Sequence, residues 1–237
     1  MQRYFVNEFD NNTFKLNEDD TYHITKVMRM KVKDSIEVVY NNELYICEIN
    51  SFTPYVTCSI LEKVNESFIE QPKVIIAQAI VKEQKMDYIL QKSCELGVYS
   101  IVPFQAERSV VKFDKDISKK ITRWQKILKE ASEQSKRLNI PILNEITDLK
   151  LLKNIEADKK FVCSVKEKSK TIKRVLSNVN NSDTILFVIG PEGGLSDVEE
   201  KELIEGGFMP ISLGDNVLRT ETASSFILSS VCYEFMR

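Results

Sequence analysis

The segment Ile185-Leu186-Phe187-Val188-Ile189-Gly190-Pro191-Glu192-Gly193-Gly194, with the Leu195-Ser196-Asp197-Val198-Glu199 that follows it, decides the fold. Five consecutive apolar residues ending in a glycine turn are typical of a buried strand. Ser196 and Glu199 have the spacing of a capping box, in which each side chain bonds a free backbone N–H at a helix start. We therefore expect a buried strand, a tight turn and a capped helix.

Glycine is rare in this chain and concentrated in one region. Six of the seven glycines lie between Gly190 and Gly214. Because glycine costs backbone entropy, it is expected where a positive φ or a close backbone approach is required. Ligands of parallel α/β sheets bind outside the carboxyl ends of the strands, and a helix N-terminus offers free N–H donors. The glycine segment therefore predicts a ligand pocket, and a tight turn without a ligand is the alternative.

The pattern around Gly190 restricts the kind of ligand. It is neither G-x-G-x-x-G with a later ribose-binding acid nor G-x-x-x-x-G-K-[ST], so a nucleotide with a phosphate chain is disfavoured. Backbone amides and carbonyls in such a turn suit an adenine edge and an amino-acid carboxylate.

A second strand end, Leu213-Gly214-Asp215-Asn216-Val217-Leu218-Arg219-Thr220-Glu221-Thr222-Ala223, also leads into a helix. Thr220 is the expected N-cap of that helix. Arg219 beside it opposes the helix dipole. Its position therefore indicates either a functional role or an ion pair with Glu192 or Glu221.

Strands and helices alternate along most of the chain. The first seventy residues contain short strands with hairpin turns such as Asn41-Asn42, which indicate a compact barrel, and residues 65–72 are the candidate linker. Beyond Pro72, the alternation predicts a parallel sheet covered by helices on both faces. The expected strands there are Val74–Ala77, Ile101–Phe104, Phe161–Val165, Thr184–Ile189 and Met209–Leu213, and the expected helices are Glu83–Leu96, Ile117–Arg137, Lys170–Ser177, Asp197–Glu205 and Glu221–Phe235.

The composition argues against several classes of protein. The five cysteines are scattered and His23 is the single histidine, so neither a metal site nor a Cys-His nucleophile is expected. No apolar run approaches the ~20 residues of a membrane helix, and the start lacks a secretory pattern, so we expect a cytoplasmic protein. The net charge is −2, but Arg108–Arg137 holds ten Lys/Arg against four Asp/Glu. That region indicates a polyanion-binding surface or a solvated helix face.

Taken together, these motifs resemble the ribosomal RNA small subunit methyltransferase E family, in the knotted SPOUT class of RNA methyltransferases. The resemblance covers essentially the whole chain, and its last two segments are the most specific. The matching segments are Arg3–Phe5, Val27–Val32, Lys85–Asp87 with Gln91-Lys92 and Glu95–Val98, Glu107–Val110, Glu133–Ser135, Gly190–Gly194 and Leu218–Ala223. The chain departs from the family pattern at Lys33 and Lys136, where glycine is common, and at Asn216, where a basic residue is common.

The resemblance implies an α/β fold in two domains. A PUA-like β-barrel RNA-binding domain is expected over residues 1–70, and an α/β-knot methyltransferase domain with a deep trefoil knot over residues 71–237. The family also implies a homodimer that binds S-adenosylmethionine, without metal or membrane, and methylates N3 of a uridine in 16S ribosomal RNA of the small subunit.

The resemblance also implies residue roles. The cofactor-binding residues are then Ile189, Gly190, Pro191, Glu192, Gly194, Leu213, Gly214, Val217 and Leu218. The RNA-binding residues are then Arg3, Arg29, Lys31, Arg108, Lys112, Arg123, Gln134 and Arg137.

Methylation of uridine at N3 requires loss of the N3 proton. We expect Arg219 to stabilise the anion that develops on the ring carbonyls, and Glu133 or Glu221 to accept the proton. The alternatives are a methyltransferase of the same class acting on transfer RNA or on a ribose hydroxyl, and a non-catalytic RNA-binding module.

Overall fold

The computed structural model describes residues 1–65, 70–111 and 117–236, so Lys112 and part of the expected linker lie outside the described residues. The chain divides into two compact units. The first comprises Met1–Phe68 and Ser132–Ile140, and the second comprises Ile69–Ala131 and Pro141–Arg237. The sequence-based division into residues 1–70 and 71–237 therefore lacks one feature, because Ser132–Ile140 groups with the first unit.

The first unit is built on one mixed sheet. Its strands, within the described residues, are β1 (Arg3–Phe5), β2 (Glu8–Asp10), β3 (Thr13–Lys15), β4 (Ser35–Tyr40), β5 (Glu43–Ser51) and β6 (Thr57–Val64), in the order β1-β4-β5-β6-β3-β2. Helix α1 (Glu18–Tyr22) and the π-helical turn η1 (His23–Val27) follow β3. Asn41 and Asn42, with φ of 51° and 63°, form the turn between β4 and β5. The predicted Asn-Asn hairpin is confirmed, since Tyr40 pairs with Glu43 across this turn. Two left-handed residues suit such a turn because their backbone matches the twist of the paired strands.

Arg3 ties the segment Ser132–Ile140 to the sheet of the first unit. Its side chain is buried, and its Nε donates to Glu37 Oε2 at 2.7 Å. Its Nη1 donates to the backbone carbonyls of Lys136 and Arg137. Lys136 Nζ lies 3.0 Å from the same Glu37 oxygen. Glu37 therefore binds two cations, one from β1 and one from the returning segment.

We expect Glu37→Gln to destabilise the first unit by about 2 kcal/mol at pH 7, because charged hydrogen bonds in a partly buried place are lost. Burial raises the pKa of Glu37, but hydrogen bonds from Lys136 and Arg3 outweigh burial and hold it below its ordinary value. A lowered folded-state pKa gives stability that is present above the unfolded pKa, about 4.3, and is lost as pH falls through the folded pKa.

Urea unfolding at pH 7 and at pH 3 measures this contribution. The difference between wild type and Glu37→Gln should shrink at the lower pH. The control is Glu43→Gln, which removes the exposed ion pair between Glu43 and Lys63 in the same unit and should leave the unfolding midpoint unchanged. Equal midpoints for wild type and Glu37→Gln at pH 7 would contradict the prediction.

The second unit contains a parallel sheet. Its strands, as far as the chain is described, are β7 (Lys73–Ala79), β8 (Ser100–Gln105), β9 (Ile142–Leu143), β10 (Thr147–Asp148), β11 (Lys159–Cys163), β12 (Thr184–Ile189) and β13 (Met209–Ile211). They run in the order β10-β8-β7-β12-β11-β13, with β9 also beside β8. Each of these pairs is parallel. The predicted parallel sheet is confirmed.

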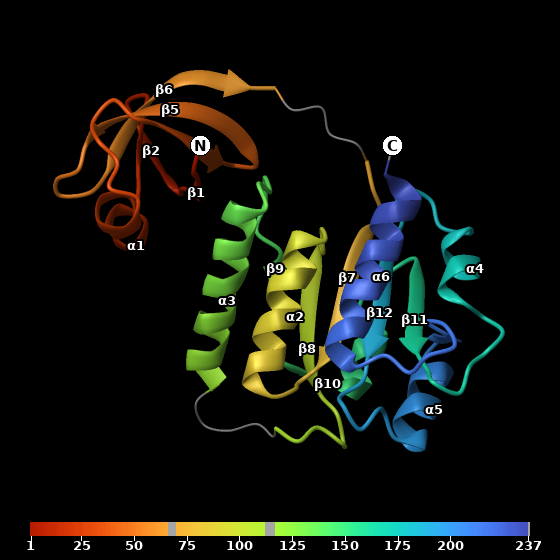
Figure 1. The fold of residues 1–237 in the computed structure, drawn as a ribbon. Helices are drawn as coiled ribbons and strands as arrows, with labels where there is room; N and C mark the ends of the chain where they lie inside the picture. The colour runs from red at the N-terminus through yellow and green to blue at the C-terminus, as the bar shows by residue number, and fades with distance from the viewer. Residues whose placement is uncertain (66–69, 112–116, 237) are drawn as a thin grey trace. The chain divides into compact units, whose positions relative to one another are not determined.

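Helices cover both faces of this sheet. One face carries α2 (Glu83–Glu95), α3 (Ile117–Gln134), α4 (Ile172–Leu176) and α6 (Thr220–Phe235), and the other carries η2 (Leu149–Asn154) and α5 (Asp197–Glu205). Figure 1 shows α2, α3 and α6 side by side along one face. Residues of β12 alternate between two apolar clusters, with Phe187 in the first and Leu186 in the second. A strand with both faces buried explains its unbroken apolar sequence.

Several element boundaries differ from the sequence-based ones, and two of the helices are shorter than expected for local reasons. The helix expected to reach Arg137 ends at Gln134, because Lys136 takes a left-handed φ of 60° and Arg137 N–H donates back to the Ser132 carbonyl at 3.0 Å. The helix expected over Lys170–Ser177 is limited to α4, because the residues before it form an ordered loop described below. Among the described residues, no helix is both long and apolar enough to cross a membrane.

Candidate functional site

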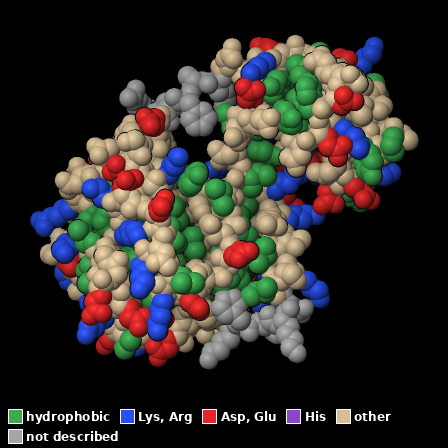
Figure 2. Space-filling view, turned by 180° about the vertical axis from the view of Figure 1, so that it is seen from behind, with side chains coloured by type: hydrophobic (Ala, Val, Ile, Leu, Met, Phe, Trp, Pro, Cys, Tyr) green, Lys and Arg blue, Asp and Glu red, His purple; other side chains and the backbone are tan. Residues whose placement is uncertain are grey.

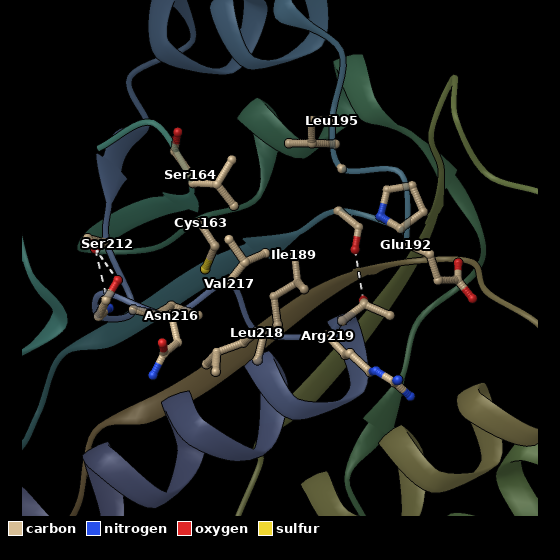
Figure 3. A pocket seen from close by; sticks show the side chains of 18 of the residues that line it. Cys163, Ser164, Ile189, Glu192, Leu195, Ser212, Asn216, Val217, Leu218 and Arg219 are labelled. Carbon is tan, nitrogen blue, oxygen red and sulfur yellow. Dashed lines mark hydrogen bonds between the residues drawn. The ribbon is translucent and has the colours of Figure 1, made fainter. Parts of the chain in front are cut away.

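A cavity of about 310 Å³ lies at the carboxyl ends of β11, β12 and β13 in the second unit. Three strand ends supply most of its wall, and the first turns of α2 and α6 complete it. Figure 3 shows Glu192 and Arg219 on one side of this pocket, with Ser212 and Asn216 on the opposite side. Neighbouring parallel strands end at the same edge, which is the usual position of a ligand site in such a sheet.

The glycine loop, Gly190–Leu195, forms the wall after β12. A Cβ at Gly190 would lie 3.0 Å from the Leu195 backbone nitrogen and 3.2 Å from the Gly194 carbonyl carbon, so this position requires glycine. Gly194 has a φ of 68°, and its N–H donates to the Pro191 carbonyl at 2.9 Å. The loop therefore folds back on itself as a tight turn and exposes bare backbone to the cavity.

The capping box predicted at the end of this loop is confirmed. Ser196 Oγ accepts from Glu199 N–H at 3.3 Å, and Glu199 Oε2 accepts from Ser196 N–H at 2.8 Å. The second Glu199 oxygen accepts from the Glu107 backbone N–H at 2.7 Å. The start of α5 is therefore fixed both locally and to the loop after β8.

Thr220 joins the two walls of the cavity. Its hydroxyl donates to the Gly190 carbonyl at 2.8 Å and accepts from Gln78 Nε2 at 2.9 Å. The prediction of Thr220 as the N-cap of α6 is wrong: Arg219 occupies the cap position and makes no side-chain cap, and Thr220 is the first helical residue. The physical reason is that the Thr220 hydroxyl is committed to the neighbouring strand ends.

Lys85 of α2 holds the two carboxylates that could have paired with Arg219. Lys85 Nζ lies 3.1 Å from Glu192 Oε1 and 3.5 Å from Glu221 Oε2. The hydrogen bond to Glu192 raises the pKa of Lys85. Burial raises the pKa of Glu192, but hydrogen bonds from its own N–H and from Lys85 outweigh burial and leave it below its ordinary value. Lys85 and Glu192 therefore both remain charged at neutral pH.

Arg219 is exposed at the rim of the cavity. Within the described residues its guanidinium has neither a hydrogen bond nor an ion pair, so of the two alternatives left open by the sequence the ion pair with Glu192 or Glu221 is wrong. An unpaired arginine, at a helix start where the dipole disfavours a cation, is available to an anionic or electron-rich ligand.

Arg108 contacts the glycine loop. Its Nη1 donates to the carbonyls of Gly193 at 3.1 Å and of Leu195 at 3.2 Å. Its Cβ would lie 3.3 Å from a Cβ at Gly193. The arginine assigned from sequence to RNA therefore braces the outside of the glycine loop.

The nine residues expected to bind the cofactor all line the cavity: Ile189, Gly190, Pro191, Glu192, Gly194, Leu213, Gly214, Val217 and Leu218. Of the expected catalytic residues, Arg219 lines it and Glu221 adjoins it through Lys85. Glu133 is buried in the segment grouped with the first unit and is not among the lining residues.

The structure places the expected RNA-binding residues in different settings. Arg29, Lys31 and Gln134 are exposed in the first unit. Arg3 is 3% exposed and saturated by Glu37 and backbone carbonyls, which is unsuited to a phosphate contact. Arg137 donates to the carbonyl and side-chain oxygens of Asn139. Arg123 pairs with Glu83 and Asp87 of α2. Lys112 lies outside the described residues.

The sequence reasoning missed one whole wall of the cavity. Further lining residues come from the end of β11, from α2 and from the remaining positions of the other loops: Lys85, Cys163, Ser164, Val165, Lys168, Leu195, Ser212, Asp215, Asn216, Thr220 and Ala223. The signal was present, because the expected strand over Phe161–Val165 ends there. Its position next to β12 and β13 follows from strand order, which the local pattern does not give.

Comparisons with known proteins agree with this architecture. The family model described as an RNA methyltransferase domain matches residues 69–232, and that described as an RNA methyltransferase PUA domain matches residues 16–53. The ribosomal RNA small subunit methyltransferase E of Bacillus subtilis is 36% identical over 99% of this chain and 97% of its own. That of Mesomycoplasma hyopneumoniae is 36% identical over 97% of this chain and 98% of its own.

Two solved structures are also similar over nearly the full length. A Legionella pneumophila protein, in complex with the bound cofactor SAM, has 31% identity and a TM-score of 0.88 over 98% of this chain and 96% of its own. The ribosomal RNA small subunit methyltransferase E of Neisseria gonorrhoeae, bound to S-adenosylmethionine, has 27% identity and a TM-score of 0.87 over 98% of this chain and 97% of its own. With an α/β unit that matches the RNA methyltransferase domain and full-length relatives of one kind, the chain belongs to the ribosomal RNA small subunit methyltransferase E family.

Proposed function

We propose that this protein transfers the methyl group of S-adenosylmethionine to N3 of a uridine in 16S ribosomal RNA. The observation that carries the proposal is the cavity at three parallel strand ends, with the unpaired guanidinium of Arg219 at its rim. Family membership supplies the class of reaction, and two relatives of similar fold were solved with this cofactor.

The residues of the cavity fit S-adenosylmethionine. The positions where glycine is required, at Gly190 by close approach and at Gly214 by a φ of 121°, leave backbone N–H and carbonyl groups uncovered. Ile189, Leu213 and Leu218 supply apolar surface suited to an adenine ring. We propose that these residues hold the adenosine part, and that Glu192 and the remaining lining residues named above complete the site.

The bound cofactor supplies an electrophilic methyl group. Uridine N3 becomes a good nucleophile only when its proton leaves, and negative charge then appears on the two ring carbonyls. Arg219 stabilises that charge with its fork of N–H donors, an oxyanion-type role. Glu221 accepts the proton, directly or through water, since Glu133 is not among the residues that line the cavity. Lys85 keeps Glu192 and Glu221 from repelling each other.

The proposal includes two further family properties. The second unit contains the deep trefoil knot of this class, and two copies of the chain form a homodimer. Both are supported by family membership and by the full-length similarity to the solved relatives. We also propose that the first unit, which is a PUA-like domain, binds the ribosomal RNA.

Methyl transfer from labelled S-adenosylmethionine to 30S particles that lack the modification tests the proposed function. Nucleoside analysis should show label in 3-methyluridine. Label in a ribose-methylated nucleoside, or in transfer RNA alone, would replace the proposed substrate with the alternative one. Cofactor binding without any transfer would favour a non-catalytic RNA-binding module.

We expect Arg108→Ala to weaken S-adenosylmethionine binding by about 3- to 10-fold, because two partly exposed hydrogen bonds that brace the glycine loop are worth about 1 kcal/mol. Isothermal titration calorimetry measures it. Arg123→Ala is the control, since its partners lie on α2, and it should leave cofactor affinity unchanged. Unchanged cofactor affinity in Arg108→Ala, with weakened RNA binding, would return Arg108 to the RNA surface.

A further inference from the structure

The segment Lys166–Arg174, which comprises most of the loop after β11 and the first turn of α4, is strongly basic. It contains Lys166, Lys168, Lys170, Lys173 and Arg174 against the single acid Glu167. The part of the chain that follows has the opposite balance, because Asn180–Arg237 holds three Lys/Arg and ten Asp/Glu. On the face shown in Figure 2, Lys and Arg side chains are mixed with Asp and Glu. The cluster of positive charges in this segment is therefore a local feature, and it is suited to binding an anionic partner.

Glu167 orders this loop from within. Its Oε1 accepts hydrogen bonds from the backbone N–H groups of Lys168, Ser169 and Lys170, at 2.8, 2.6 and 3.1 Å. The Ser169 hydroxyl donates to the same oxygen at 2.8 Å. These hydrogen bonds lower the pKa of Glu167 to about 2, and the bond from the Ser169 hydroxyl makes the largest contribution. The loop is thus held by one carboxylate that stays ionised throughout the physiological range.

The loop is also fixed to the wall of the cavity. Ser212, which lines the cavity, donates its N–H to the Lys170 carbonyl at 2.8 Å and accepts from Ile172 N–H at 2.9 Å. Lys168 itself lines the cavity. Figure 3 shows Cys163 and Ser164, which lead into the loop, on the same side of the pocket as Ser212. The loop therefore carries its lysines at the cavity mouth.

Three of these cations are exposed and unneutralised. Lys168, Lys170 and Lys173 have no acidic partner anywhere in the described ranges, whereas Lys166 pairs with Asp197 at 2.5 Å. Arg174 donates to the Ser169 carbonyl at 3.0 Å and so braces the loop. On α5, by contrast, Lys201 has an acidic partner in Glu205, whereas none of these three lysines has one among the described residues.

We propose that Lys168, Lys170 and Lys173 bind phosphates of the RNA strand that enters the cavity. The assignment rests on the proposed function for the identity of the RNA, and it adds a contact surface in the second unit to the one expected in the first. A loop that is already ordered loses little entropy when it binds, and lysines are suited to phosphate as point charges.

The test is the double variant Lys170→Gln/Lys173→Gln, which spares Lys168 in the cavity wall. It is titrated with unmodified 30S particles and with a uridine-rich single-stranded oligonucleotide at several salt concentrations. Each lost phosphate contact lowers the salt slope of a single-stranded complex by about 0.7, so two contacts lower it by about 1.4. We expect RNA affinity to fall at least tenfold at low salt, with unchanged cofactor affinity.

The matched control is Lys150→Gln/Lys153→Gln, which removes the same charge from η2, away from the cavity. Its salt slope should equal that of wild type. Equal slopes for the two double variants would overturn the proposal, as would a loss of cofactor affinity alone in the loop variant. The outcome is independent of catalysis: a wild-type protein that binds RNA through this loop but transfers no methyl group would contradict the proposed function only.

Discussion

Arg219→Ala should lower the turnover number for methyl transfer by about 10²- to 10³-fold, the usual effect of removing a donor aimed at a developing oxyanion. The side chain is exposed and without a partner in the described parts of the chain, so its removal breaks no contact that holds the fold. Cofactor affinity should change little, because the proposed role of Arg219 is directed at the uracil ring. The loss should therefore appear in kcat at saturating S-adenosylmethionine.

Three measurements separate this role from a structural one. Thermal unfolding of Arg219→Ala should match wild type, and calorimetry should give a cofactor affinity within about threefold, which is less than 0.7 kcal/mol. Arg219→Lys should recover only part of the rate, since an ammonium keeps the charge but loses the planar fork. Full turnover by Arg219→Ala on 30S particles would refute the assignment.

Gly190→Ala should weaken S-adenosylmethionine binding by about 30-fold or more, roughly 2 kcal/mol, within the range for overpacked positions. The added Cβ would meet the Leu195 nitrogen at 3.0 Å and the Gly194 carbonyl carbon at 3.2 Å. Both are backbone atoms, so the whole loop must move. The Gly190 carbonyl also accepts the hydrogen bond of Thr220, and the displacement therefore reaches the start of α6.

Gly193→Ala is the matched control in the same loop. Its Cβ would lie 3.3 Å from Cβ and 3.6 Å from Cδ of Arg108, a side chain that can move. We expect at most a threefold loss of affinity, about 0.7 kcal/mol. Calorimetric titration of both variants decides the matter, and equal affinities for the two would show that the close approach at Gly190 is not what shapes the site.

Local patterns predicted the central strand and its helix correctly. The expected bounds Thr184–Ile189 and Asp197–Glu205 coincide with β12 and α5. Both are determined by neighbouring residues: a strand buried on two faces needs an unbroken apolar run, and a capping box satisfies its N–H groups within four residues. The wall of the cavity after β12 could therefore be identified from sequence.

Features that depend on distant partners could not be predicted in this way. Thr220 has the sequence pattern of an N-cap, but its hydroxyl bonds Gly190 and Gln78 from other strands. The family resemblance implies an RNA contact at Arg3, but its side chain is buried against Glu37 and the carbonyls of residues 136 and 137. In each case the partner of the residue lies thirty or more positions away, and the order of the strands decides which groups meet.

The departures at Lys33 and Lys136 have a common explanation in the backbone. Their φ angles are 76° and 60°, in the left-handed region. Glycine, which the family resemblance leads one to expect at both positions, enters that region without steric cost, whereas a side chain with a Cβ is strained there. Each lysine therefore raises the conformational energy of its turn relative to glycine at the same position.

The return of Ser132–Ile140 to the first unit affects how the gene can be divided. A truncation that begins at residue 71 would leave this segment without β1 and Glu37, and a fragment that ends at residue 70 would leave Arg3 without the carbonyls of residues 136 and 137. Residues 1–70 are therefore not sufficient to form the complete N-terminal unit. A chimaera that exchanges this unit between relatives must transplant two stretches of coding sequence together, and an exchange at residue 70 alone should yield poorly folded hybrids.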